Sequence, residues 1–291
     1  MDVSHRSGWS RLFRTARVVF WVAVVLMIFH QLTGPARLDA ARAAALDGFQ
    51  QQRRSRVIAM IHRQDTVSLF GVPVSSSIDI EDSEAILRAI RSTPPEQPID
   101  LILHTPGGLV LAAEQIAHAL VERKGKVTVF VPHYAMSGGT LLALTADEVV
   151  MDPNAVLGPV DPQIGDLPAA SIVKLLELKP RAQISDEMLV LADVAIKARN
   201  QVASFAAEVL LKHQPKERAL ALATALSEGR WTHDFPITVE AAKALGLPIS
   251  TSMPHQVYEL MDLYPQAGEG RPSVSYVPLK RPPSDGTRDE Q

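Results

Sequence analysis

The sequence predicts an α/β fold with a mainly parallel sheet, and three observations predict it. Short apolar runs alternate with helix-like segments through the middle of the chain. Glycine pairs at 107–108 and 138–139 follow two of the apolar runs. Strand–turn–helix units of this kind form right-handed crossovers between parallel strands. Reactive groups are then expected at the C-terminal ends of the strands, where both glycine pairs fall.

Composition excludes several classes of function. The chain has 291 residues and 46% hydrophobic content, enough for one large domain with appendages. Its net charge of −3 gives no sign of a nucleic-acid partner. Cysteine is absent, which excludes disulfides, thiolate metal sites and cysteine nucleophiles. The histidines lack metal-ligand spacing, so neither a metal nor another cofactor is expected.

The N-terminus predicts attachment to a membrane. A basic arm at 1–17 precedes an apolar segment at 18–33, in which Phe20 and Trp21 suit a bilayer interface. We expect 18–33 to be a single transmembrane helix. A cleaved signal peptide and a buried core helix are the alternatives. The arginines of the arm favour an exported catalytic domain, although further arginines follow the segment on its other side.

The remaining elements follow in order. Alanine and charged residues at helical spacing predict a spacer helix at 34–52, between the membrane and a domain at 53–265. Apolar runs predict strands at 56–61, 99–103, 127–131 and 149–151. Amphipathic patterns predict helices at 80–90, 109–121, 139–147, 185–212, 217–226 and 239–245. Residues 266–291 are rich in proline, glycine and charge, which predicts a flexible tail.

The second glycine turn carries a candidate nucleophile. Residues 135–140 read Ala-Met-Ser-Gly-Gly-Thr, between a predicted strand and a predicted helix. Glycines after Ser137 allow a sharp turn and keep side chains away from a substrate. Backbone N–H groups of Gly107, Gly108 and Gly138 could stabilise an oxyanion formed when Ser137 attacks a carbonyl. The alternative is that both glycine pairs are ordinary strand-to-helix turns.

Five motifs together resemble a known family. They are His-Thr-Pro-Gly-Gly at 104–108, Val-Phe-Val-Pro-His-Tyr-Ala-Met-Ser-Gly-Gly-Thr at 129–140, Asp-Pro-Asn-Ala-Val-Leu-Gly-Pro-Val-Asp-Pro-Gln at 152–163, Trp-Thr-His-Asp-Phe-Pro-Ile at 231–237 and Met-Asp-Leu-Tyr-Pro at 261–265. Over about residues 53–265 the chain resembles the serine dehydrogenase proteinase family. These are membrane-associated Clp-fold serine peptidases, related to signal peptide peptidase A and the stomatin-operon proteases.

The resemblance implies a Clp/crotonase fold, peptide-bond hydrolysis and Ser137 as the nucleophile. It also implies a homo-oligomer that acts on peptides or membrane proteins. Clp proteases carry a histidine soon after the serine, but residues 160–163 read Val-Asp-Pro-Gln. The membrane relatives use a lysine base, which works when desolvation lowers the pKa of the amine. Lys197 is the predicted base, with Lys179 and Lys174 as alternatives.

Two other functions remain open. A crotonase-type acyl-CoA enzyme would share the fold and the backbone oxyanion hole, but would use carboxylates and bind a nucleotide-bearing thioester. A non-catalytic membrane scaffold would keep the fold without a working proton acceptor. Affinity for CoA separates the first from a peptidase, and replacing the candidate lysines one at a time tests the second.

Overall fold

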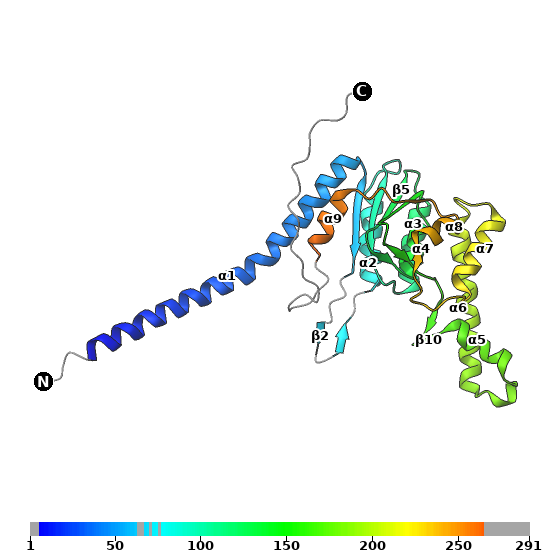
Figure 1. The fold of residues 1–291 in the computed structure, drawn as a ribbon, viewed down its shortest axis with the longest axis horizontal. Helices are drawn as coiled ribbons and strands as arrows, with labels where there is room; N and C mark the ends of the chain where they lie inside the picture. The colour runs from blue at the N-terminus through cyan, green and yellow to red at the C-terminus, as the bar shows by residue number, and fades with distance from the viewer. Residues whose placement is uncertain (1–5, 63–66, 70–71, 75–76, 265–291) are drawn as a thin grey trace, which may run out of the picture.

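In the computed structural model, a twisted parallel sheet is covered by helices on both faces, and one long helix projects away from it (Figure 1). The structure describes residues 6–62, 67–69, 72–74 and 77–264, with side chains described at 16–24, 36–62 and 77–264. The predicted tail at 266–291 and the start of the basic arm lie outside these residues.

The central sheet confirms the predicted mixed α/β fold. Its five strands are parallel, in the order β1-β4-β5-β7-β12. They are β1 (Arg56–Ile61), β4 (Ile99–His104), β5 (Val127–Val131), β7 (Glu148–Met151) and β12 (Ile249–Ser250). Every residue of β4 and β5 is buried, as expected for central strands with both faces covered. The two candidate glycine turns follow these strands.

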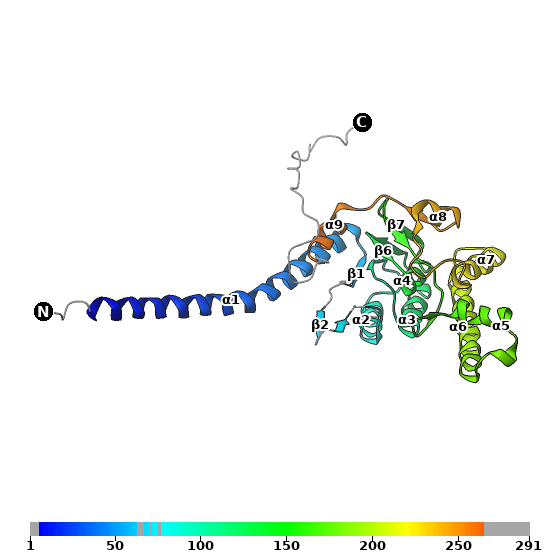
Figure 2. The same ribbon diagram turned by 60° about the horizontal axis from the view of Figure 1, so that its bottom comes forward.

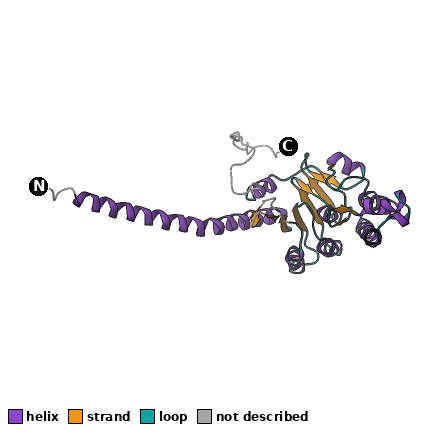
Figure 3. Cartoon of the chain, turned by 90° about the horizontal axis from the view of Figure 1, so that it is seen from below, coloured by secondary structure: helices purple, strands orange, loops and turns teal. Residues whose placement is uncertain are grey.

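Helices pack on both faces of this sheet (Figure 3). One face is covered by α2 (Ile80–Arg91), α3 (Val110–Val121) and α4 (Gly138–Ala143), with α8 (Val239–Ala244) in the same apolar core. The other is covered by α9 (His255–Asp262) and the end of α1, where Phe49 packs against Phe130. Asp79 and Asp82 cap α2 reciprocally, which fixes where this helix begins.

A small second sheet was not predicted from the sequence. It joins β6 (Tyr134–Ala135), β8 (Val156–Leu157) and β11 (Ile237–Thr238), and Leu157 pairs with both Ala135 and Ile237. Strands β6 and β8 are parallel, whereas β8 and β11 are antiparallel. Two-residue strands are too short for a periodic pattern, so only tertiary pairing defines them.

Three helices form the end of the domain farthest from the N-terminus (Figure 1). They are α5 (Ala169–Leu178), α6 (Asp186–Leu210) and α7 (Lys216–Ser227). The hydroxyl of Ser185 accepts a hydrogen bond from the amide of Met188 and caps α6, so the predicted start of this helix is confirmed. Short pieces complete the described chain: β2 (Val67–Leu69), β3 (Val72–Val74), β9 (Gln163–Ile164), β10 (Leu167–Pro168) and the 3₁₀ turn η1 (Arg181–Gln183).

Helix α1 (Arg6–Arg53) runs without interruption for 48 residues, about 70 Å, through the predicted arm, anchor and spacer (Figure 2). The guanidinium of Arg53 bonds the buried carboxylate of Asp100 and so ties the end of α1 to the sheet. Within the described residues, no helix has both the length and the apolarity needed to cross a bilayer. Because the side chains at 25–35 are not described, the anchor at 18–33 stays a prediction.

Candidate active site

Ser137 occupies the sharp turn between β6 and α4, where its backbone is strained. Its φ of 50° and ψ of −115° lie outside the regions that non-glycine residues normally adopt. Such a conformation costs about 1–3 kcal/mol and persists only where the surrounding structure imposes it. A serine on a strained strand-to-helix turn exposes its hydroxyl at the edge of the sheet, as hydrolase nucleophiles require.

The two glycine turns lie against each other. Gly107 and Gly108 have φ values of +101° and +155°, which favour glycine. A Cβ on Gly107 would lie 2.7 Å from the Cβ of Ser137, and one on Gly108 would lie 2.2 Å from the carbonyl oxygen of Ile78. Neither Gly107 nor Gly108 therefore tolerates a larger residue, and the fold brings both candidate turns to one place.

The amides of Gly108 and Gly138 are available as donors. In the described part of the chain, no hydrogen bond from the amide of Gly108 or of Gly138 to a protein acceptor is found. A Cβ on Gly138 would lie 3.8 Å from the nitrogen of Gly108, so the two N–H groups are close neighbours. A pair of unused amides beside a presented hydroxyl can stabilise an oxyanion.

The small sheet gathers three polar residues at one of its ends. Ser137 follows β6 by two residues, Asp161 follows β8 by four, and His233 precedes β11 by four. Because β6 and β8 are parallel and β11 is antiparallel to β8, all three residues extend from the same end of this sheet. Pairing between strands thus joins positions that are distant in the sequence.

Asp161 and His233 form a direct pair. The Nδ1 atom of His233 lies 2.8 Å from Oδ1 of Asp161, whose residue is 2% exposed. The amide of Gln163 donates to the other carboxylate oxygen at 2.8 Å. A carboxylate only accepts hydrogen bonds, so Nδ1 of His233 carries the proton and Nε2 is the basic nitrogen.

The carboxylate also changes the acidity of this histidine. The hydrogen bond that His233 donates to Asp161 raises the pKa of His233, and the negative charge of Asp161 adds to the rise, whereas partial burial opposes it. A carboxylate that orients an imidazole and stabilises its protonated form is the arrangement found beside nucleophilic serines in hydrolases.

A cavity connects the serine with the aspartate. Ser137, Gly108, Gly138 and Asp161 line a space of about 20 Å³. A groove of about 750 Å³ between α3 and α6 adjoins it and shares residues with it. The shared residues are Val110, Pro162 and Val202. The small space can hold a reacting carbonyl and the groove can hold the chain around it.

The predicted lysine bases lie elsewhere. Lys197 on α6 is 66% exposed and pairs with Asp193 at 2.5 Å, one helical turn away. Ala195 and Val202 mark the buried face of α6, and helical periodicity directs Lys197 to the opposite face. Lys174 and Lys179 are exposed on α5 and at its end. Among the described residues, no lysine lines the cavity of Ser137.

His233 is not among the site residues predicted from the sequence. Both residues lie in motifs that carry the family resemblance, Asp161 at 152–163 and His233 at 231–237. No spacing rule connects residues 161 and 233, because their proximity depends on the pairing of β8 with β11. The described residues hold no group of three or more His, Cys, Asp or Glu side chains suited to a metal ion.

A family model matches almost the whole chain. The family described as ClpP-like SDH-type serine proteinase matches residues 10–290. Two uncharacterized proteins of Methanocaldococcus jannaschii are similar over most of their length. One is 51% identical over 271 residues, 93% of this chain and 95% of the relative, and the other is 53% identical over 260 residues, 89% and 88%. "Probable protease SohB" of Haemophilus influenzae is 39% identical over 85 residues, 28% of this chain and 23% of that protein.

Proposed function

Since this chain belongs to the family of ClpP-like SDH-type serine proteinases, we propose that it hydrolyses peptide bonds through an acyl-enzyme formed on Ser137. The observation that carries the mechanism is the pair of Asp161 and His233, because Asp161 lines the cavity of Ser137 and binds the imidazole. We assign the general base to His233 rather than to a lysine.

Proton transfer follows from the tautomer. Oγ of Ser137 attacks the carbonyl carbon of the peptide bond while Nε2 of His233 accepts the hydroxyl proton. The imidazolium then gives that proton to the leaving amine, and the C–N bond breaks. Water repeats the sequence on the ester, which releases the acid and restores the hydroxyl. Asp161 keeps the proton on Nδ1 throughout and stabilises the imidazolium.

The amides of Gly108 and Gly138 stabilise the oxyanion in both steps. Their positions are fixed by backbone geometry, so little reorganisation is needed as charge develops on the carbonyl oxygen. The groove between α3 and α6 receives the flanking peptide, with Val110 and Phe205 as apolar contacts and the amides of Asn200 and Gln201 as polar ones. Its size suits an extended chain.

Membrane anchorage at 18–33 is part of the proposal. Residues 18–22 are five successive large apolar residues on α1, each between 51% and 62% exposed. Five successive positions cover the whole circumference of a helix. A partner helix would cover one side only, whereas a bilayer covers every side. The basic arm then favours a catalytic domain on the exported side.

Self-association is also part of the proposal. Leu178, Val190 and Val194 are large apolar residues exposed on α5 and α6, and the last two share one face of α6. A second copy of the chain could cover them, as in the homo-oligomer that the family resemblance implies. Sedimentation of the full chain in detergent tests this assembly.

Labelling with a fluorophosphonate probe tests the proposed chemistry. The probe should label the native protein, Ser137→Ala should neither react nor cleave peptide, and His233→Ala should react far more slowly. Lys197→Ala is the matched variant on the competing base and should retain the native rate. Normal cleavage by Ser137→Ala would refute the hydrolase assignment, and a native rate for His233→Ala with loss in Lys197→Ala would restore the lysine mechanism.

A further inference from the structure

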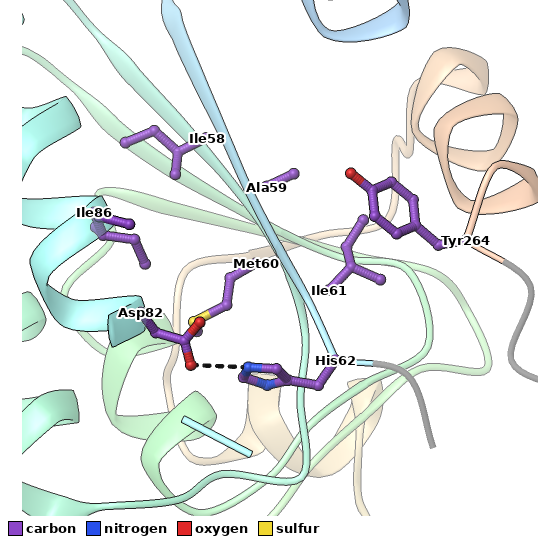
Figure 4. A pocket seen from close by; sticks show the side chains of 9 residues that line it. Ile58, Ala59, Met60, Ile61, His62, Asp82, Ile86 and Tyr264 are labelled. Atoms are coloured by element: carbon purple, nitrogen blue, oxygen red, sulfur yellow. Dashed lines mark hydrogen bonds and ion pairs between the residues drawn. The ribbon is translucent and has the colours of Figure 1, made fainter. Parts of the chain in front are cut away.

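A second histidine–carboxylate pair lies beside a different cavity. His62 follows the edge strand β1 and is 7% exposed, and its Nε2 lies 3.0 Å from Oδ2 of Asp82 on α2 (Figure 4). Both residues line a cavity of about 280 Å³ together with side chains of β1, α2 and Tyr264. The proposed hydrolysis makes no use of this pair.

The hydrogen bonds of His62 run in one direction toward the first glycine turn. Asp82 accepts from Nε2, so Nδ1 of the neutral ring is an acceptor. The hydroxyl of Thr105 lies 2.7 Å from Nδ1 and donates to it. The same hydroxyl oxygen accepts from the amide of Gly107 at 3.1 Å. In this series, His62 and Thr105 each donate one hydrogen bond and accept one.

Thr105 also contacts the turn that carries Ser137. Its carbonyl accepts a hydrogen bond from the amide of Met136 at 3.0 Å. Its methyl group packs on the second turn, since a Cβ on Gly139 would lie 2.5 Å from Cγ2 of Thr105. The rotamer of Thr105 therefore determines contacts with both turns.

Gly107 lies directly against the turn that carries Ser137. A Cβ on Gly107 would lie 2.7 Å from the Cβ of Ser137 and 3.2 Å from the nitrogen of Gly138. The next residue, Gly108, provides one of the two proposed oxyanion donors. A rotation at Gly107 would thus move this donor relative to the serine.

We propose that His62 is a positioning residue: through Thr105 it holds the Gly107 turn at the distance from Ser137 that the oxyanion hole requires. The inference rests on the proposed function. His62 cannot accept the serine proton, because both of its nitrogens are committed. Without Nδ1, the hydroxyl of Thr105 can donate only to the carbonyl of Gly107, at 3.4 Å, where the amide of Ile78 already donates at 2.7 Å.

His62→Ala tests the role of the imidazole. We expect kcat to fall by about 10- to 100-fold with KM nearly unchanged, because a small displacement of catalytic donors affects the transition state more than the ground state. The cavity of about 280 Å³ beside residue 62 is large enough for free imidazole, so added imidazole should restore part of kcat. His213→Ala is the matched control, since His213 is a partly buried histidine that contacts Asp147 and the carbonyl of Thr145 rather than either glycine turn.

Replacement of Thr105 gives an independent test that depends less on folding. Thr105→Ser keeps the hydroxyl and should keep most of kcat, whereas Thr105→Val keeps the shape and should lose kcat as His62→Ala does. Thr93→Val is the matched control, because the buried Thr93 hydroxyl donates only to the carbonyl of Ala89, its sole recorded partner in the described chain. Urea unfolding of each variant separates a loss of stability from a loss of kcat.

The outcomes separate the inference from the function it rests on. An inactive Ser137→Ala together with native kcat in His62→Ala and Thr105→Val overturns the positioning role alone. Normal cleavage by Ser137→Ala overturns the proposed function and this inference with it. An increase in KM at unchanged kcat also overturns it, since that would assign His62 to substrate binding.

Discussion

Two imidazole–carboxylate pairs are connected to the surroundings of Ser137: Asp161 lines its cavity, and His62 reaches the Gly107 turn through Thr105. Their hydrogen bonds give the two pairs different capacities. His233 binds Asp161 through Nδ1, and no hydrogen bond at its Nε2 is found among the described residues. His62 uses both nitrogens, on Thr105 and Asp82. An imidazole accepts a proton only at a nitrogen whose lone pair is free. In the proposed mechanism, the same two residue types therefore provide a proton acceptor in one place and a positioning group in the other.

The two carboxylates also differ in how deeply they are buried. The side chain of Asp161 is 2% exposed, whereas that of Asp82 is 30% exposed and also caps α2. A charge interaction is stronger where water is excluded, so Asp161 can act on its histidine more strongly than Asp82 can. The pKa of His233 is accordingly raised by Asp161. Asp82 accepts hydrogen bonds both from the amide of Asp79 at the start of α2 and from the ring of His62.

Replacing each histidine gives the largest expected contrast. His233→Ala should lower kcat/KM by roughly 10⁴-fold, because loss of a triad member leaves only the oxyanion hole and binding. His62→Ala should lower kcat far less, as argued above. Steady-state cleavage of a fluorogenic peptide measures both. Equal losses in the two variants would contradict the division of roles.

Replacing each carboxylate by its amide comes next. Asp161→Asn should lower kcat by about 10³- to 10⁴-fold, since an amide can stabilise the wrong tautomer of His233. Asp82→Asn should cost about 10-fold or less in kcat, because the amide can still accept from Nε2 of His62. Single-turnover acylation rates give the comparison directly. A larger loss in Asp82→Asn than in Asp161→Asn would reverse the assignment of the two pairs.

The first glycine turn should show an intermediate effect. Gly108→Ala places a Cβ 2.2 Å from the carbonyl oxygen of Ile78 and displaces an oxyanion donor. We expect a loss of about 10²- to 10³-fold in kcat, the usual effect of removing one such donor. Kinetics with circular dichroism as a check on folding measure it.

Gly48→Ala is the control for this substitution. Gly48 lies in α1 with nothing within 4 Å of an added Cβ, so alanine should raise the free energy of unfolding by about 0.5–1 kcal/mol without changing kcat. Native kcat in Gly108→Ala would contradict the assignment of that amide to the oxyanion hole.

The sequence predicted the parts of this molecule that are periodic or local. Buried runs such as 99–103 and 127–131 became central strands, and the cap at Ser185 marked the start of α6. The turn at Ser137 could be predicted because a serine before two glycines between a strand and a helix is itself a local signal. These features need only neighbouring residues to be recognised.

The proposed partner of Ser137 could not be predicted in the same way. His233 and Asp161 meet through strands of two residues, which leave no hydrophobic period. Small apolar residues surround Lys197 in the sequence, which favours a desolvated amine at this position. The helical periodicity of α6, however, places the buried residues on a different face from Lys197. A helical-wheel argument applied to Ala195 and Val202 would have indicated an exposed lysine.

The smallest expected effect is a shift in the pH dependence. Asp161 raises the pKa of His233 above its ordinary value, and the proposed base must be neutral, so kcat/KM should fall as the pH drops through the raised pKa. Asp161→Asn should move this acid limb to lower pH, by contrast with Asp82→Asn, which should leave it in place.

The free energy of unfolding should depend on pH in the direction opposite to that of kcat/KM. Because folding raises the pKa of His233, protonation favours the folded state; the contribution is complete below the unfolded-state pKa of about 6.5 and is lost as the pH rises through the folded pKa. Urea titrations of native protein and Asp161→Asn between about pH 5 and 9 measure this difference. Identical pH dependence in both proteins would show that Asp161 does not control the proton on His233, and the distinction between the two histidines would then rest on geometry alone.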